Sequence, residues 1–236
     1  GCSAMDELLP AKGYSRGTIV EWVADRGSGA GFLSLLAARN AAREGGGLVI
    51  VDSQGEFYPP AARALGLKMS HLIIVRSSEQ GPCQSLSPHS SEPLDAGDFC
   101  WAIDQSLRSP AVAAVWGELP AFDSTHAERT WLRRFQISAE TSGCIGFFTR
   151  TEKPVHSSWA EVQWKLRPQA SSAAGRRIKA TLVRCQGGMT GQSVNLEINM
   201  LTGSVQEHVS RSQPAHSLPL AAPLASSASR RRSARA

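Results

Sequence analysis

The sequence predicts an α/β domain with a mostly parallel central sheet and antiparallel strands added at its C-terminal edge. Short apolar runs without polar alternation indicate strands that are covered on both faces. Helical segments separate these runs at least four times, which is the alternation that builds βαβ units. After Arg150 the pattern changes to alternating strands joined by tight turns, which is typical of antiparallel pairing.

The strands and helices of the parallel part follow one another in a regular order. TIVEWV at 18–23 is the first strand, and a glycine-containing segment leads from it into a helix with apolar residues on one side. LVIV at 48–51 and HLIIV at 71–75 are buried strands, separated by a helix that starts with two prolines. The series is completed by a helix over 96–109, a strand at 111–116, a helix over 127–143 and a strand at 144–149.

The antiparallel part contains strands at 162–168, 176–186 and 192–205, the last two joined by the turn GGMTG. We therefore predict one folded domain over residues 1–205. The remaining residues, 206–236, are rich in Ala, Ser, Pro and Arg and are expected to form a disordered basic tail.

The composition indicates a globular, cytoplasmic protein. Apolar residues make up 42% of the 236 residues, and no apolar run approaches the roughly 18 residues of a membrane span. The net charge of +5 lies mainly in the tail, where five arginines accompany one glutamate from Val205 onward. The folded body is therefore nearly neutral, so the basic isoelectric point does not by itself indicate a DNA-binding face.

The cysteines are widely spaced, without a CxxC pair or a nearby histidine that could complete a zinc site. We expect them to be reduced, with Cys100 and Cys144 buried. The sequence predicts neither a metal site nor a catalytic thiol. The five are Cys2, Cys83, Cys100, Cys144 and Cys185.

The segment VADRGSGAGFLSLLAARN has the form of a phosphate-binding loop that runs into a helix. Such a turn binds anions because the first N–H groups of the helix are unpaired and lie at the positive end of its dipole. The complete motif adds a lysine for the β- and γ-phosphates and a Ser or Thr hydroxyl for magnesium. Gly27, Ser28 and Gly29 keep the bend, but Ala30 and Gly31 stand at those two positions. A glycine turn without a binding role is the alternative.

Two later segments have the same order of strands and polar residues as a known protein family. In LVIVDSQGEFYPPAARALGL a buried strand is followed by Asp52, a small residue, Gln54 and a glycine, and the strand of AVAAVWGEL ends at Glu118. This order resembles the RecA-type ATPases. The resemblance puts Gln54 where the family has a glutamate that polarises the attacking water, and an amide cannot accept a proton as a carboxylate does. It puts Glu118 at the acidic magnesium ligand; a surface glutamate at a strand end is the alternative.

The resemblance covers roughly residues 5–205 and implies a RecA-like P-loop core in which ATP binding is weak or lost. No catalytic residue and no cofactor are expected. The helix and strand TWLRRFQISAETSGCIGFFTR are similar to the family's sensor region, with Thr149 or Arg150 where recombinases have a glutamine. The connection from Arg150 to Ala160 is shorter than a recombinase DNA-contacting loop and lacks its glycine-rich stretch.

This short form with an eroded loop resembles the ImuA family of accessory proteins in damage-induced mutagenesis. The resemblance implies an assembly role in translesion synthesis beside an ImuB-type Y-family polymerase homologue. RecA and an error-prone replicative-type polymerase are further partner candidates, and DNA contact is expected to be weak or indirect. The final hairpin, with its basic strand start and closing TG, supports the same assignment.

Three groups of residues are candidates for contacts with a partner or DNA. Arg133 and Arg134 lie together on a predicted helix, where a solvated helix face is the alternative. Trp159 lies in a short polar loop where a base could stack, whereas tryptophans inside predicted elements are expected in the core. The tail arginines could attract phosphates or dock in an acidic groove, but they cannot read a base sequence. They are Arg230, Arg231 and Arg232.

Two other functions remain as alternatives. A divergent ATPase that binds ATP and single-stranded DNA would need a lysine from elsewhere, and Lys12 is the nearest one along the chain. A SulA-type inhibitor of cell division would share the RecA-like fold.

Overall fold

The computed structural model describes residues 2–25, 27–43, 45–76, 95–122, 124–151, 160–171, 175–199 and 202–208. These residues form one nine-stranded sheet in the order β3-β2-β4-β5-β1-β6-β7-β8-β9. The strands are β1 (Ile19–Val23), β2 (Gly47–Val51), β3 (Leu72–Val75), β4 (Val112–Glu118), β5 (Ile145–Arg150), β6 (Val162–Pro168), β7 (Arg176–Cys185), β8 (Ser193–Ile198) and β9 (Val205–Glu207).

The helices begin and end where the sequence supplies the expected signals. The Ser124 hydroxyl accepts a hydrogen bond from the Ala127 N–H at 3.1 Å, which caps α5, and Gly143 ends that helix in the left-handed conformation. Two prolines open α3. The helices are α1 (Ser3–Asp6), α2 (Ala30–Ala41), α3 (Pro59–Ala64), α4 (Ala96–Arg108) and α5 (Thr125–Ser142), with a 3-10 turn at Met69–His71.

The sheet is parallel from β3 through β6, and antiparallel pairing begins only at β7. The predicted antiparallel extension is confirmed, since β6–β7, β7–β8 and β8–β9 all pair antiparallel. On its other edge β6 also pairs with β1 in parallel, which the sequence pattern did not predict. The physical reason is burial, because the side chains from Val162 through Trp164 are covered on both faces, like those of the other interior strands.

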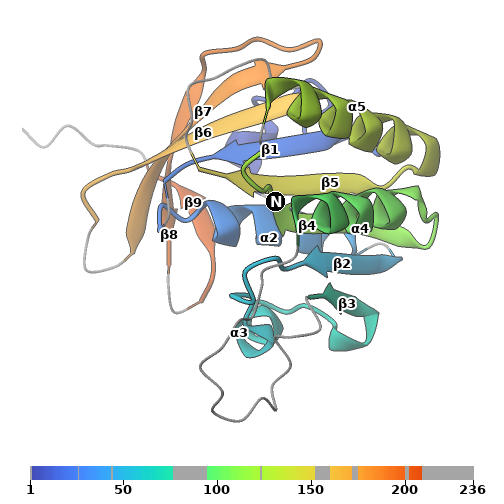
Figure 1. The fold of residues 1–236 in the computed structure, drawn as a ribbon. Coiled ribbons are helices and arrows are strands. Elements are labelled where there is room, and N and C mark those ends of the chain that lie inside the picture. The colour runs from blue at the N-terminus through green and yellow to red at the C-terminus, as the bar shows by residue number, and fades with distance from the viewer. Residues whose placement is uncertain are drawn as a thin grey trace, which may run out of the picture.

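Each face of the sheet is covered by its own apolar cluster. Figure 1 shows α4 and α5 lying next to each other over one face, where Phe99, Phe135 and Phe148 are fully buried. On the other face α2 and α3 pack against a cluster that contains Trp22 and Trp164. The expectation that Cys100 and Cys144 are buried is confirmed; Cys83 lies outside the described residues.

The tryptophans depart from the expected core packing at one position. Trp22 and Trp164 are buried and stack with ring centroids 6.1 Å apart. Trp101 on α4 is 59% exposed, so the expectation of a core position is wrong for it. Helical periodicity placed Trp101 on α4 but did not show that the face it occupies is uncovered.

The far end of the described chain extends past the predicted domain boundary at residue 205. β9 continues to Glu207 and pairs with β8, and the His208 N–H donates to the Asn195 carbonyl at 2.7 Å. The candidate contacts Trp159, Arg230, Arg231 and Arg232 lie outside the described residues. Within the described part, no helix is both long and apolar enough to cross a membrane.

Candidate functional site

The carboxyl ends of β1, β2, β4 and β5 border one groove with a volume of about 500 Å³. Parallel strands end at the same edge of a sheet, and ligands of open α/β sheets bind outside that edge where the strand order reverses. Every residue predicted as part of a vestigial nucleotide site lines this groove. These residues are Gly27, Ser28, Gly29, Ala30, Gly31, Gln54 and Glu118.

The bend of the loop depends on two glycines in the left-handed conformation. Gly27 has φ 74° and Gly29, which caps α2, has φ 94°. A Cβ on Gly29 would lie 2.6 Å from Ile178 Cδ1, so the loop packs directly against β7. Ser28 is buried, and its hydroxyl has no hydrogen-bond partner within the described chain. The loop is therefore a turn that the core supports, with its N–H groups at the start of α2.

The positions of the lysine and the hydroxyl hold residues that contribute no polar side chain. Ala30 is buried in the α2-side cluster. A Cβ on Gly31 would lie 3.8 Å from the indole ring of Trp116, which belongs to β4. The Trp116 Nε1–H donates to the Ser34 hydroxyl at 2.8 Å, and that hydroxyl donates to the Gly31 carbonyl at 3.1 Å. An indole thus occupies the space beside the position where the resemblance expects a magnesium-binding hydroxyl.

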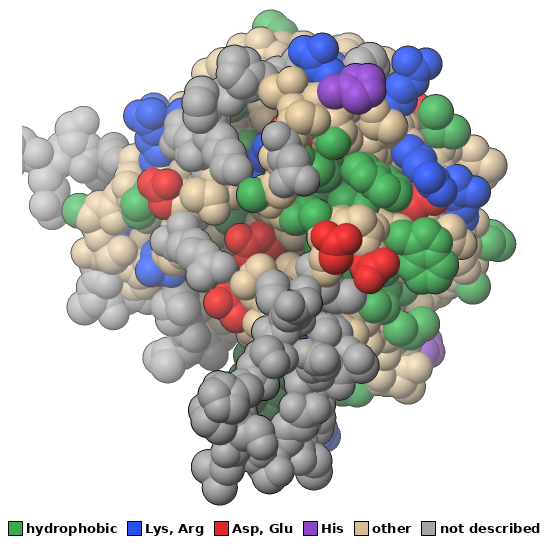
Figure 2. Space-filling model, in the orientation of Figure 1, with side chains coloured by type: hydrophobic (Ala, Val, Ile, Leu, Met, Phe, Trp, Pro, Cys, Tyr) green, Lys and Arg blue, Asp and Glu red, His purple; other side chains and the backbone are tan. Residues whose placement is uncertain are grey.

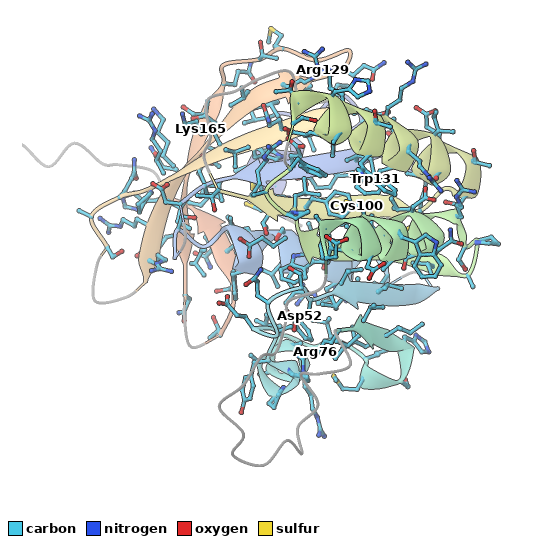
Figure 3. The ribbon with its side chains drawn as sticks, in the orientation of Figure 1. Asp52, Arg76, Cys100, Arg129, Trp131 and Lys165 are labelled. Atoms are coloured by element: carbon cyan, nitrogen blue, oxygen red, sulfur yellow. The ribbon has the colours of Figure 1, made fainter. Side chains whose placement is uncertain are left out.

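Asp52 organises the loop that follows β2. Its two carboxylate oxygens accept the backbone N–H groups of Glu56 and Phe57, both at 3.0 Å. Arg76 pairs with the same carboxylate at 2.8 Å and also donates to the Phe57 carbonyl; Figure 3 shows Asp52 and Arg76 next to each other. Gln54 is exposed on this loop. Asp52 therefore fixes the backbone around Gln54.

Arg150 is held by the protein's own carboxylates at the end of β5. Its Nη1 lies 2.6 Å from Glu128 Oε1 and 3.5 Å from Glu21 Oε1. Glu21 is fully buried, and its other oxygen accepts a hydrogen bond from Gln163 Nε2 at 2.9 Å. The guanidinium offsets the desolvation of Glu21 and is committed to these ion pairs. Thr149, the other residue proposed for the sensor position, is buried beside it.

The described charges that line the groove are mainly acidic. Four carboxylates accompany two guanidiniums, and Figure 2 shows acidic side chains grouped near the centre of the view. The lining includes no described lysine, position 31 lacks a hydroxyl, and an amide stands at position 54. The N–H groups at the start of α2 are an anion-binding element of the kind that phosphate loops use, whereas positions 30 and 31 supply neither an ammonium nor a hydroxyl. The charged residues are Asp25, Asp52, Glu56, Glu118, Arg150 and Arg176.

The structure bears on two of the sequence-based alternatives and corrects the one that concerns Lys12. Lys12 lines a different cavity, against the C-terminal half of α2, so it cannot serve the loop at the N-terminus of that helix. Arg134 is exposed, as the alternative of a solvated helix face expected, and it also pairs with the buried Asp104 at 2.8 Å and lies over the Trp131 ring at 5.2 Å. Arg133 is exposed on the same helix.

Sequence reasoning missed three charged residues of the groove. Glu56 follows Gln54 by two residues and lines the groove, and Arg176 reaches it from β7. Asp25 belongs to the loop itself. The carboxylate in QGE was a usable signal, whereas nothing local marks Arg176, because it arrives through sheet topology. Across the described ranges, no group of three potential metal ligands occurs.

Comparisons with known proteins agree with this architecture. No family model matches the sequence. The RecA protein of Limosilactobacillus reuteri is 34% identical over 140 residues, covering 50% of this chain and 39% of that protein. The RecA protein of Streptococcus equi subsp. zooepidemicus is 35% identical over 83 residues, covering 34% of this chain and 22% of that protein. The chain thus matches less than two-fifths of the length of these relatives.

A solved structure resembles nearly the whole described fold. The crystal structure of the RadB recombinase matches with a TM-score of 0.66 and 14% identity, covering 89% of this chain and 98% of that chain. The predicted fold class, an α/β core with a mostly parallel sheet and antiparallel edge strands, is confirmed. The chain has a RecA-like fold and shares sequence with RecA proteins over part of its length.

Proposed function

We propose that this protein is a RecA-like accessory component of damage-induced, error-prone DNA synthesis, of the ImuA type, and that it does not hydrolyse ATP. In this proposal it acts by holding partners: an ImuB-type polymerase homologue first, with RecA and an error-prone replicative-type polymerase as further candidates. The observation that carries the proposal is the groove itself, in which Ala30 and Gly31 stand where the resemblance expects the lysine and the hydroxyl.

The loss of hydrolysis is supported by three features of that groove. An ammonium at position 30 would meet the β- and γ-phosphates, and the methyl group of Ala30 cannot replace its charge. The Trp116 ring lies beside Gly31 instead of a hydroxyl. Gln54 can orient a water molecule but cannot take its proton. Each change removes part of the electrostatic stabilisation on which phosphoryl transfer depends.

Steady-state ATP turnover of the purified chain tests this part. We expect no magnesium-dependent hydrolysis above background and little thermal shift with ATP. The matched controls are Glu118→Gln and Glu56→Gln, which remove two groove carboxylates that could hold magnesium or activate water. A contaminating ATPase gives the same rate in all three proteins. Turnover that is present in the original chain and falls in either variant contradicts the proposal.

The scaffold role predicts binding without catalysis. Pull-down from damaged cells, followed by titration of the purified chain with the ImuB-type homologue, measures it directly. We infer that the basic tail contributes to this contact, so removing it should weaken binding. The cut belongs after His208, since β9 runs to Glu207 and an earlier cut would remove a strand of the sheet. Unchanged affinity of the shortened chain contradicts the role of the tail, and absence of binding by the full chain contradicts the scaffold role.

A second candidate function is contact with nucleic-acid phosphates on the antiparallel part of the sheet. Arg167 on β6 lies directly opposite Lys179 on β7, and Lys165 lies two residues before Arg167 on the same face. Figure 3 shows Lys165 on β6. Like charges facing each other across strands reduce stability, which favours a polyanion as their counterpart.

Salt-dependent binding to single-stranded DNA separates this candidate from the first. Lys179→Glu should weaken binding to every sequence alike and reduce the salt slope by about one unit. Lys68→Glu, which reverses a charge on the chain segment next to β3, serves as the control. Equal weakening by both substitutions indicates only a general charge effect.

A further inference from the structure

A separate cavity lies at the other end of β2 from the nucleotide groove. The groove borders Val51, the last residue of β2, whereas this cavity borders Leu48 near the beginning of the strand. Its volume is about 470 Å³, and its wall combines the end of α2 with the segment 66–72 that leads into β3. Because β2, β3 and β4 are parallel, the cavity and the groove lie at opposite ends of these strands.

Every titratable side chain in the described lining of this cavity is basic. Arg39 and Arg43 come from the end of α2, and Lys68 and His71 come from the segment before β3. Arg43, Lys68 and His71 are exposed, so a partner can reach them. None of these three side chains has a hydrogen bond or an ion pair within the described residues. The nucleotide groove, by contrast, contains four described carboxylates.

Arg39 holds a fixed position between α2 and the segment before β3. Its Nη1 donates to the Leu65 carbonyl at 2.6 Å, and its Nε and Nη2 donate to Asn40 Oδ1 at 3.2 and 2.9 Å. These bonds use three of the five guanidinium N–H groups, and both acceptors are neutral. Burial and the neighbouring Arg43 lower the pKa of Arg39, as expected for a positive charge without a counterion beside it.

The end of α2 balances only part of this positive charge. A helix C-terminus carries about half a negative charge, which stabilises basic residues in the last turn. Arg39, Arg43 and Lys68 each carry a full positive charge. Glu44, the next acidic residue along the chain, lies outside the described residues, and even its full charge would leave this set positive. The cavity therefore favours an anionic occupant that the described residues do not supply.

The cavity also has an apolar part. Leu48, Leu67 and Leu72 line it, and Leu72 is partly exposed. Met69, which follows Lys68, is 39% exposed. An apolar centre with a polar rim is the usual anatomy of a protein–protein contact. A single nucleic-acid strand would instead need aromatic side chains on which its bases stack, and no Phe, Tyr or Trp belongs to the described lining.

We propose that this cavity docks an acidic peptide segment of a partner protein, whose carboxylates pair with Arg43 and Lys68 and whose apolar side chain packs against Leu72 and Met69. Opposite charge across such a contact speeds association and fixes its register. The inference rests on the proposed scaffold role, to which it adds a docking surface. The experiment below uses neither ATP nor an ImuB-type homologue, so its failure is distinguishable from failure of the scaffold role.

Fluorescence anisotropy of a labelled peptide titrated with the full-length chain tests the proposal. The probe is the hexapeptide Glu-Glu-Leu-Asp-Leu-Glu. We expect saturable binding, which should weaken at least about tenfold for the uncharged Gln-Gln-Leu-Asn-Leu-Gln and at least about threefold for Glu-Glu-Ser-Asp-Ser-Glu, which lacks the apolar side chains. Absence of binding, equal binding of either analogue, or displacement of the probe by less single-stranded DNA than unlabelled peptide overturns the proposal.

Variants and amide signals locate the contact. Arg43→Gln and Lys68→Gln each remove one exposed charge and should each weaken binding about threefold, and the double variant about tenfold. Lys179→Gln removes an exposed charge on β7 and should leave the affinity unchanged. Thermal unfolding confirms that each variant is folded. In protein labelled with nitrogen-15, the amide signals of residues 66–72 should shift as the peptide binds. Unchanged affinity in the double variant, equal weakening by Lys179→Gln, or shifts confined to other residues overturns the proposal.

Discussion

Replacing Gly29 by alanine tests whether the phosphate-type loop is a turn held by the core. Gly29 has φ 94°, and an added Cβ would lie 2.6 Å from Ile178 Cδ1. The left-handed conformation costs about 1–2 kcal/mol for a residue with a Cβ. Overpacking a tight contact costs typically about 1–3 kcal/mol. We therefore expect Gly29→Ala to lower the free energy of unfolding by about 2–5 kcal/mol.

Two further substitutions separate the backbone cost from the clash. Gly27 also has a positive φ, but a Cβ there would meet nothing within 4 Å, so Gly27→Ala should cost only about 1–2 kcal/mol. Ile178→Val removes the Cδ1 atom and by itself should cost about 0.5–1.5 kcal/mol. Because it removes the atom that clashes, the double variant Gly29→Ala/Ile178→Val should be more stable than the sum of the two single effects predicts.

Urea unfolding followed by far-ultraviolet circular dichroism measures all four proteins under one condition. The linear extrapolation gives the free energies if the slopes agree between variants. Equal costs for Gly29→Ala and Gly27→Ala, or strict additivity in the double variant, would refute the packing of β7 on the loop.

Three further predictions concern other parts of the fold. Asp104→Ala removes the buried carboxylate that Arg134, Arg108 and Ser138 share, so thermal unfolding should show that the free energy of unfolding falls by about 1–3 kcal/mol. Asp98→Asn at an exposed position should lower it by less than about 0.5 kcal/mol. Equal effects of the two substitutions would contradict the shared role of Asp104. Asp52→Asn weakens the pairing with Arg76, so the Glu56 and Phe57 amides should exchange hydrogen faster, and unchanged protection would contradict the role of Asp52 in this loop. Burial raises the pKa of the Cys100 and Cys144 thiols to about 12, so neither should react with a thiol reagent in the folded chain at pH near 8, whereas Cys2 should react. Since these thiols ionise near 9 only after unfolding, the free energy of unfolding should fall as the pH rises from about 9 towards 12, and a flat profile in urea titrations would contradict their burial.

The order of the strands and helices was predictable because continuous apolar runs identify interior parallel strands. The run from Leu48 to Val51 is buried on both faces, as its lack of alternation indicates. β6 was predicted as a strand, but its parallel pairing with β1 was not, because Gln163 between Val162 and Trp164 gives the run an alternating pattern. The Gln163 amide bonds to the buried Glu21 on β1, a contact between residues far apart in the sequence. Local sequence patterns therefore could not predict this hydrogen bond between polar side chains inside the sheet.

The candidate site was predictable to the extent that its residues lie at strand ends. Gln54 and Glu118 meet in one groove because their strands are parallel neighbours. Lys12 was considered for the loop because it is near in sequence, but β1 lies between the two in the chain. The five residues of this strand span about 17 Å, so Lys12 is far from the loop in space. Lys12 therefore stands toward the amino end of β1 and the loop at its carboxyl end.

The pattern of what the loop keeps and what it lacks separates the needs of the fold from those of ATP chemistry. Gly29 is required by its backbone conformation and by its contact with Ile178, so the chain could not replace it without strain. Ala30 and Gly31 open the helix with backbone conformations that do not require glycine, and the Trp116 ring lies beside Gly31. A loop that transfers phosphate needs the lysine and the hydroxyl in addition to the glycines. A loop that only connects β1 to α2 needs the glycines alone, and this chain has that arrangement, which supports the scaffold role that we propose.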